Sequence, residues 1–178
     1  SDAALLERVV GGDETALACL YERYAPVVFG FVRRRVPDRG LAEEVCGDVW
    51  LGCWRSARAF RGDSRVLTWL LGIASRQVVM STRGRRRPTV PLDEDLEAVA
   101  VESDDPAVAV VDAAGVAELT AAIRQLPAEL YEVVVLAWLH ELPYSEIAGA
   151  VGIPVGTVKS RMMRARRLLQ ARVGERNA

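Results

Sequence analysis

An acidic stretch without a single basic residue divides this chain of 178 residues. Residues 88–118 contain nine acids and no lysine or arginine, and residues 88–106 contain three prolines but few large apolar side chains. Such a segment cannot bury enough apolar surface to offset the conformational entropy that ordering would cost. We therefore expect a flexible acidic linker over 88–117, joining an N-terminal domain, 1–87, to a C-terminal domain, 118–178.

Apolar residues on both sides of this linker recur at helical spacing, which predicts an all-α fold of two small helical bundles. Asp13 is a candidate N-cap for a helix that stops near Pro37. A second long helix is expected over about 41–57, and a third begins near Ser64. The side chains of these last two helices expected to face the core are Val45, Val49, Cys53, Trp54, Leu67, Trp69, Leu70, Ile73, Val78 and Val79.

The C-terminal domain is predicted to contain a helix-turn-helix between residues 142 and 161. Before it, Pro127 stands at a junction and an apolar helix spans about 130–140. Gly152 suits the positive φ that ends a helix, and Pro154 suits the start of the next one. The apolar stripes of the two helices are Ile147, Ala148 and Val151, then Val158, Met162, Ala165 and Leu169.

The opposite face of the second helix is basic and could lie in a DNA major groove. An ordinary surface helix hairpin would account for the apolar stripes, but not for the small alanine, the glycine turn and the basic face together. The residues on this face are Lys159, Ser160, Met163, Arg164 and Arg167.

The charge distribution also favours a nucleic-acid partner. The formal net charge of −1 conceals a net charge of +5 over residues 1–87 and +3 over 119–178, on either side of the acidic stretch. Basic blocks of this kind indicate a polyanionic partner, although a solvated helical surface would carry such charges too.

Other classes of protein find little support in the residues. Three cysteines are too few and too badly spaced for a zinc site or a disulfide framework, and His140 is the single histidine. The longest apolar run, 133–139, is far too short for a membrane span, and no basic-then-apolar leader opens the chain. We therefore expect a cytoplasmic protein that is not an enzyme, needs no cofactor or metal, and does not insert into a membrane.

Two groups of motifs resemble the extracytoplasmic-function (ECF) sigma factors of the sigma-70 family. Residues 42–55, Phe60-Arg61-Gly62-Asp63-Ser64 and Thr68-Trp69-Leu70 resemble region 2 of that family; Leu126-Pro127 and residues 144–166 resemble region 4. The resemblance implies a bacterial transcription initiation factor that binds core RNA polymerase and directs recognition and opening of promoter DNA. An anti-sigma factor is a further partner that it implies. The alternative is a stand-alone helix-turn-helix regulator whose N-terminal half serves dimerisation or ligand sensing.

The resemblance also implies three groups of site residues. Region 4 would read the −35 element through the basic helix face, with Thr157 and Arg161 added to the five residues named above. Region 2 would recognise and melt the −10 element with a base-capturing loop and the helix beside it: Ser56, Phe60, Arg61, Asp63, Trp69 and Arg76. The exposed side of the second helix would dock on the polymerase through Glu43, Glu44, Asp48 and Arg55.

Structural interpretations of some of these residues stay open at this point. Trp69 could equally be core or DNA-facing, Phe60 could form a local hydrophobic cap, and either Asp63 or Ser64 could cap the third helix. The acidic linker could thread a positively charged cleft of the polymerase or act as a plain spacer. Gly47 and Gly52 stand where the family usually carries long polar side chains, so contacts with the polymerase and upstream DNA would be weaker there.

Overall fold

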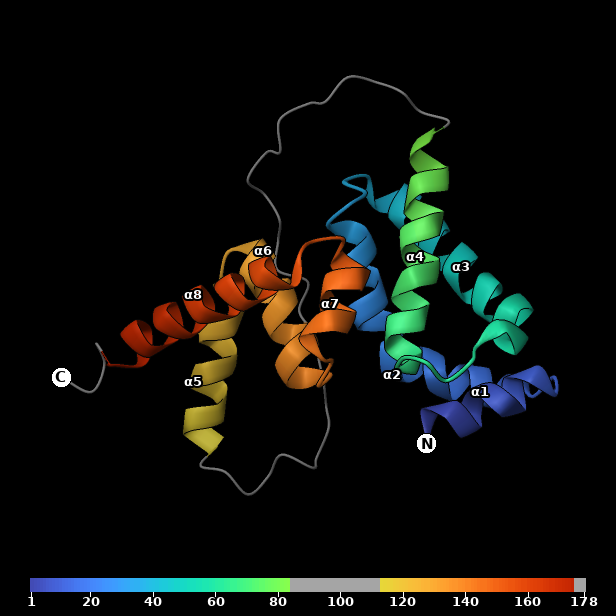
Figure 1. Ribbon diagram of the computed structural model, residues 1–178, viewed down its shortest axis with the longest axis horizontal. Coiled ribbons are helices and arrows are strands. Elements are labelled where there is room, and N and C mark those ends of the chain that lie inside the picture. The colour runs from blue at the N-terminus through green and yellow to red at the C-terminus, as the bar shows by residue number, and fades with distance from the viewer. Residues whose placement is uncertain (84–112, 175–178) are drawn as a thin grey trace. The chain divides into compact units, whose positions relative to one another are not determined.

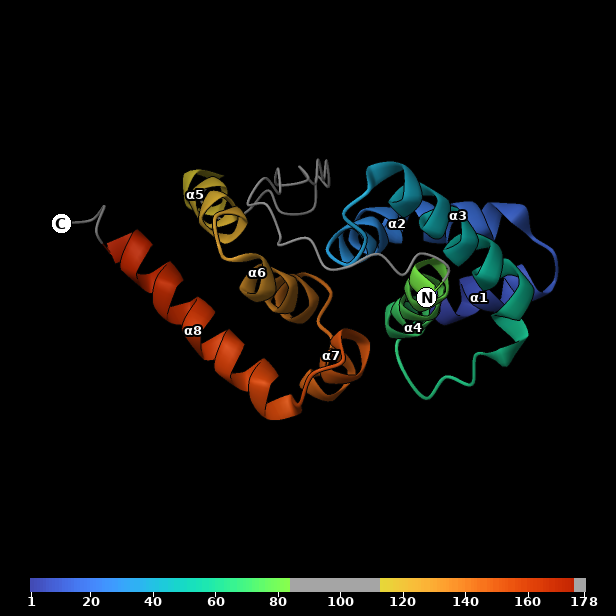
Figure 2. The same ribbon diagram turned by 90° about the horizontal axis from the view of Figure 1, so that it is seen from above.

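The computed structural model describes residues 1–83 and 113–174, which belong to two compact helical units. The described part of the first unit contains helices α1–α4 and that of the second contains α5–α8 (Figures 1 and 2). No strand occurs in these two ranges, and the predicted all-α fold is confirmed. Most of the predicted linker lies outside the described residues, and α5 begins at Ala113, inside the range predicted as linker.

Two aspartate caps start the long helices of the first unit. The Asp13 carboxylate accepts hydrogen bonds from the backbone N–H groups of Thr15 (2.9 Å) and Ala16 (3.2 Å), so the predicted N-cap is confirmed. Asp38 accepts one from the N–H of Leu41 at 2.7 Å. The helices of this unit are α1 (Asp2–Val10), α2 (Glu14–Arg33), α3 (Arg39–Ser56) and α4 (Val66–Arg83), with a 3₁₀ turn at Ala57–Ala59.

The core of the first unit differs from the prediction at three tryptophans and one valine, and Trp69, which was predicted to face the core, is half-exposed. Trp54 is only half-buried, whereas Trp50 is 8% exposed and packs edge-to-face on Tyr21 of α2, with ring centroids 5.1 Å apart. α3 packs against both α2 and α4, so its buried arc is wide enough to include Trp50. Val79 is 45% exposed because it lies one position beyond the buried Val78, about 100° further around the helix.

Gly52 lies at the closest approach of α3 and α4. A Cβ atom added there would lie 3.0 Å from Cγ2 of Ile73, which is buried in α4. A long side chain at this position would therefore collide with the core, and the glycine has a packing role that its departure from the family's usual residue did not reveal. Gly47, in the same helix, has no atom within 4 Å of its added Cβ.

The second unit begins with α5 (Ala113–Arg124), and Pro127 starts α6 (Ala128–Val134). The Pro127 carbonyl accepts hydrogen bonds from the N–H groups of Leu130 (2.8 Å) and Tyr131 (2.9 Å), which confirms the predicted junction. The predicted apolar helix continues as a π-helical segment, Val135–Leu139. Trp138 and Leu139, at its end, are exposed.

The helix-turn-helix is formed by α7 (Tyr144–Val151) and α8 (Val155–Gly174), as predicted. Gly152 adopts φ +78° and its N–H donates to the carbonyl of Ala148 at 2.9 Å, which ends α7 in a left-handed turn. Ala150, not the predicted Val151, completes the buried side of α7. The predicted stripe of α8 is fully confirmed: Val158, Met162, Ala165 and Leu169 are all buried.

Within residues 1–83 and 113–174, no helix combines the length and hydropathy that crossing a bilayer would require.

Candidate nucleic-acid interface

The exposed face of α8 carries a row of polar and basic side chains. Because one side of the helix is buried in the domain, the side chains of Lys159, Ser160, Met163, Arg164 and Arg167 are directed outward and are exposed. The predicted −35 residues are therefore brought together on one helix, except that Thr157 and Arg161 are only half-exposed at its edge. A helix of this kind has the dimensions and the donors that a major groove accepts.

An acidic side chain that the sequence analysis did not consider borders this face. Glu129, in the first turn of α6, lies 3.6 Å from the guanidinium of Arg161 and 3.9 Å from that of Arg164. The Arg161 side chain is 23% exposed and that of Arg164 is 64% exposed. Glu129 thus contacts two arginines that are three positions apart on one flank of α8.

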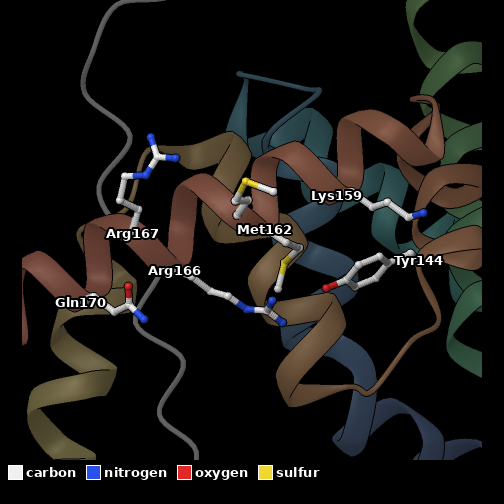
Figure 3. Close-up of a pocket in the computed structure, with 7 residues that line it drawn as sticks. Tyr144, Lys159, Met162, Arg166, Arg167 and Gln170 are labelled. Atoms are coloured by element: carbon white, nitrogen blue, oxygen red, sulfur yellow. The ribbon is translucent and has the colours of Figure 1, made fainter.

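The other flank of α8 borders a basic groove of about 330 Å³. Its lining comes mainly from α8, with Tyr144 from the start of α7. Figure 3 shows the Tyr144 hydroxyl and the Arg166 guanidinium extending toward one another, with Lys159 beside the tyrosine and Arg167 pointing away. The Arg166 guanidinium also lies 6.0 Å from the centroid of the Trp138 ring.

No carboxylate forms an ion pair with Lys159, Arg166 or Arg167 within the two described ranges. The two flanks of α8 therefore differ in their electrostatics. One carries arginines beside an acid, and the other offers uncompensated cations and a hydroxyl, which is a suitable surface for phosphate oxygens.

In the first unit, Phe60 and Trp69 form an aromatic pair at the end of α3. Their rings meet edge-to-face, with centroids 5.7 Å apart and an interplanar angle of 66°, and both side chains remain half-exposed. Trp69 is therefore neither a core residue nor a free surface residue. Phe60 packs on it as a local hydrophobic contact and leaves part of both rings accessible.

The remaining predicted −10 residues lie around this pair. Arg61 and Asp63 are exposed on either side of Gly62, whose φ of +76° turns the loop. The Ser56 hydroxyl donates to the carbonyl of Gly52 at 2.6 Å, so it is engaged by its own helix. Arg76 is exposed two turns along α4 from Trp69, on the same face.

Met80 extends this face of α4 as an exposed apolar side chain, 64% accessible. It lies one turn beyond Arg76, so the face alternates aromatic, cationic and apolar groups. Base stacking and phosphate neutralisation together require such a mixture.

The predicted polymerase-binding residues share the exposed side of α3. Glu43, Glu44, Asp48 and Arg55 are all exposed, and the Glu43 carboxylate accepts a hydrogen bond from Arg39 at 3.0 Å. Leu51, 43% exposed, lies among them and was not predicted. A single large apolar side chain within a polar surface is a typical anchor of a protein interface.

Burial argues against redox or acid–base chemistry at two of the cysteines and at the single histidine. Burial raises the pKa of the Cys53 thiol to about 11, and burial together with Glu43 raises that of Cys46 to about 11. Both thiols are therefore protonated and unreactive near neutral pH. Burial lowers the pKa of His140, so its imidazole is neutral under the same conditions.

Together, the left-handed glycine turn, the buried stripe of α8 and its basic outer face define a DNA-binding protein of the helix-turn-helix class.

Comparison with known proteins identifies the family. Residues 20–88 match the family described as Sigma-70 region 2, and residues 117–169 match Sigma-70, region 4. The chain is 32% identical over 185 residues to the ECF RNA polymerase sigma-E factor of Escherichia coli K12, covering 97% of this chain and 94% of the relative. It is 33% identical over 181 residues to the sigma-E factor of Haemophilus influenzae, covering 97% and 95%.

A solved structure described as CnrH in complex with the cytosolic domain of CnrY has a similar fold, with a TM-score of 0.53 and 21% identity. The match covers 98% of this chain and 97% of that one. The chain therefore belongs to the ECF sigma factors of the sigma-70 family, and the predicted family is confirmed. The alternative of a stand-alone helix-turn-helix regulator is not favoured.

Proposed function

We propose that this sigma factor binds core RNA polymerase and directs it to promoters, with region 4 reading the −35 element through α8 and region 2 opening the −10 element. The observation that carries the proposal is the exposed basic face of α8, set on a helix-turn-helix whose opposite side is buried. The protein acts by binding, catalyses no reaction of its own and works in the cytoplasm.

At the −35 element the two flanks of α8 take different tasks. Arg164 is exposed on the flank that carries Glu129, and a guanidinium there can bind the edge of a guanine through two hydrogen bonds. Lys159 and Arg167 carry uncompensated charge and neutralise backbone phosphates. Tyr144 and Arg166 lie at the groove beside them and add donors for the same strand.

Substitutions of single residues distinguish base recognition from phosphate neutralisation. Arg164→Ala costs roughly 1–3 kcal/mol of promoter binding and relaxes the preference at the base it contacts. Lys159→Ala weakens binding to all sequences alike and flattens the dependence of affinity on salt. The measurement is equilibrium binding of the holoenzyme to matched and altered −35 duplexes at several salt concentrations. An equal loss on every sequence for Arg164→Ala would refute its role in base recognition.

At the −10 element the half-exposed pair of Phe60 and Trp69 supplies a stacking surface for unpaired bases. Stacking on an aromatic side chain contributes about 1–3 kcal/mol per base. Arg61, Asp63 and Ser56 surround the pair, and Arg76 supplies charge along α4. Trp69→Ala therefore slows strand opening, measured with permanganate on single-stranded thymines, while Trp69→Phe retains most of it. Normal strand opening by Trp69→Ala would show that Trp69 does not stack on unpaired bases during opening.

Docking on the polymerase uses the outer side of α3. Leu51 is the apolar anchor and Glu43, Glu44, Asp48 and Arg55 form the polar rim. We expect Leu51→Ala to weaken the affinity for core polymerase without changing the helical content of the free chain. Competition against the unmodified chain for a limiting amount of core enzyme measures this directly, and equal competition would contradict it.

The acidic linker contributes through its charge, since its eight acids without a base are repelled by DNA and attracted to a basic channel. Replacing its aspartates and glutamates by asparagine and glutamine lowers transcription by the holoenzyme. Unchanged transcription would leave it a plain spacer. An anti-sigma factor, if the cell supplies one, acts by covering the polymerase-binding surfaces.

A further inference from the structure

We infer that Glu129 is a positioning residue that sets the orientation of Arg164 and thereby sharpens base selection at the −35 element. This inference rests on the proposed role of α8. It starts from an unexpected position for an acid, because a carboxylate at the border of a DNA-reading surface repels phosphate and so weakens binding to any DNA. An acid at this position therefore indicates a function that a neutral residue could not perform.

The ion pairs themselves contribute little to folding. The distances from Glu129 are 3.6 Å to Arg161 and 3.9 Å to Arg164, close to the limit of such contacts, and the carboxylate is half-exposed. Pairs of this length in contact with water stabilise a protein only slightly. Glu129 is also the acidic residue in the first turn of α6, where the helix dipole favours a negative charge. A negative charge at this position is thus favoured independently of the arginines.

The packing of α6 on α8 places Glu129 where it can orient the Arg164 side chain. α6 packs against α8, so the backbone that carries Glu129 is fixed relative to the backbone that carries the arginines. Arg161 is mostly covered and fills the inner position beside the acid, whereas Arg164 extends past it into solvent. A free arginine side chain samples many rotamers, and restricting them before binding lowers the entropy lost when the guanidinium meets a base.

The other flank of α8, which lacks such an acid in residues 1–83 and 113–174, supports the orienting role of Glu129. Lys159 and Arg167 have no such acid within the described residues, and phosphate neutralisation needs charge but no fixed orientation. The acid therefore lies only beside the arginines whose direction matters.

The test uses holoenzyme assembled from the full chain and core polymerase, transcribing a pool of promoters randomised across the −35 element. The variants are Glu129→Gln, which keeps shape and removes charge, Glu129→Asp, Arg164→Ala and the double variant Glu129→Gln with Arg164→Ala. Glu141→Gln is the matched control, since it removes from the same domain one exposed negative charge that forms no ion pair with these arginines.

We expect Glu129→Gln to lower discrimination about two- to fivefold, the range that a water-exposed ion pair allows, at the base positions that Arg164→Ala relaxes, and at no others. The double variant relaxes no further than Arg164→Ala, because Glu129 acts through that arginine. Glu129→Asp retains part of the discrimination, and the control retains all of it. A purely structural role would instead lower transcription from every promoter equally.

Three results would overturn the inference: unchanged base preferences in Glu129→Gln, relaxation at positions that Arg164 does not control, or additive effects in the double variant. Unaltered preferences in Arg164→Ala would overturn it together with the proposed role of that arginine. A holoenzyme that transcribes no promoter in the pool would refute the proposed function itself, and is recognised from the unmodified chain alone.

Discussion

Two glycines in α3 provide a quantitative test of the packing between α3 and α4. Replacing glycine by alanine in a helix interior gains about 1 kcal/mol, because alanine loses less backbone entropy on folding. Gly47 has open space around its added Cβ, so Gly47→Ala should stabilise the first unit by that amount. At Gly52 the same gain is opposed by the contact of the new methyl group with Cγ2 of Ile73 at 3.0 Å.

Ile73 is buried, so relieving that contact requires a shift of the core, and overpacking of this kind costs about 1–3 kcal/mol. Gly52→Ala is therefore expected to be less stable than Gly47→Ala by about 1–3 kcal/mol. Urea unfolding followed by tryptophan emission measures this, since Trp50, Trp54 and Trp69 all lie in the first unit and Trp138 is the only one in the other. Equal stabilisation by both substitutions would refute the close approach at Gly52.

Two further predictions concern ionisation. The hydrogen bond from the Thr15 hydroxyl is the main cause that lowers the pKa of Asp13 from its ordinary 3.8 to about 2. The charged cap therefore stabilises the fold above pH 4, and this contribution is lost as the pH falls toward 2. The difference in thermal stability between the unmodified chain and Asp13→Asn should shrink over that range, and a constant difference would contradict this. The raised pKa values of Cys46 and Cys53 predict that iodoacetamide alkylates these two thiols more slowly at pH 8 than it alkylates the exposed Cys19. Mass spectrometry measures the three rates. Equal rates would show that the fold around Cys46 and Cys53 opens readily to the reagent.

The elements that could be predicted from sequence are those fixed by local chemistry. Asp13 caps a helix, Gly152 ends one, and Pro127 starts one, because each depends on a single residue and its immediate neighbours. The stripe of α8 was predicted completely, since the helix packs on one side only and a regular 3.6-residue period then identifies its buried face.

The clearest error occurs in a helix that is covered on more than one side. α3 is covered by both α2 and α4, and its buried arc includes Trp50 instead of Trp54. Periodicity gives the direction of a buried face but not its width, which depends on helices distant in the sequence. The collision that Gly52 avoids has the same origin, since it involves a side chain of another helix.

The candidate nucleic-acid interface, like the fold, could be predicted where its residues lie close together in the sequence. Motif spacing gave the outer face of α8 and the loop at Phe60, because those residues follow one another along the chain. Glu129 was missed, since it lies on a different helix from the arginines that it contacts. Its position two residues after Pro127, directly before the helix predicted over about 130–140, was the only signal available, and it indicates a favourable dipole interaction rather than a partner.

The central claim is that two helical domains, acting through core RNA polymerase, recognise and open a promoter. Transcription from a library of genomic fragments, with and without the purified chain added to bacterial core polymerase, tests it most directly. We expect new transcripts starting at a defined distance downstream of shared −35 and −10 sequences, and their loss in Arg164→Ala and Trp69→Ala. Failure of the chain to bind core polymerase, or no new start sites when it binds, would show that the protein does not work in this way.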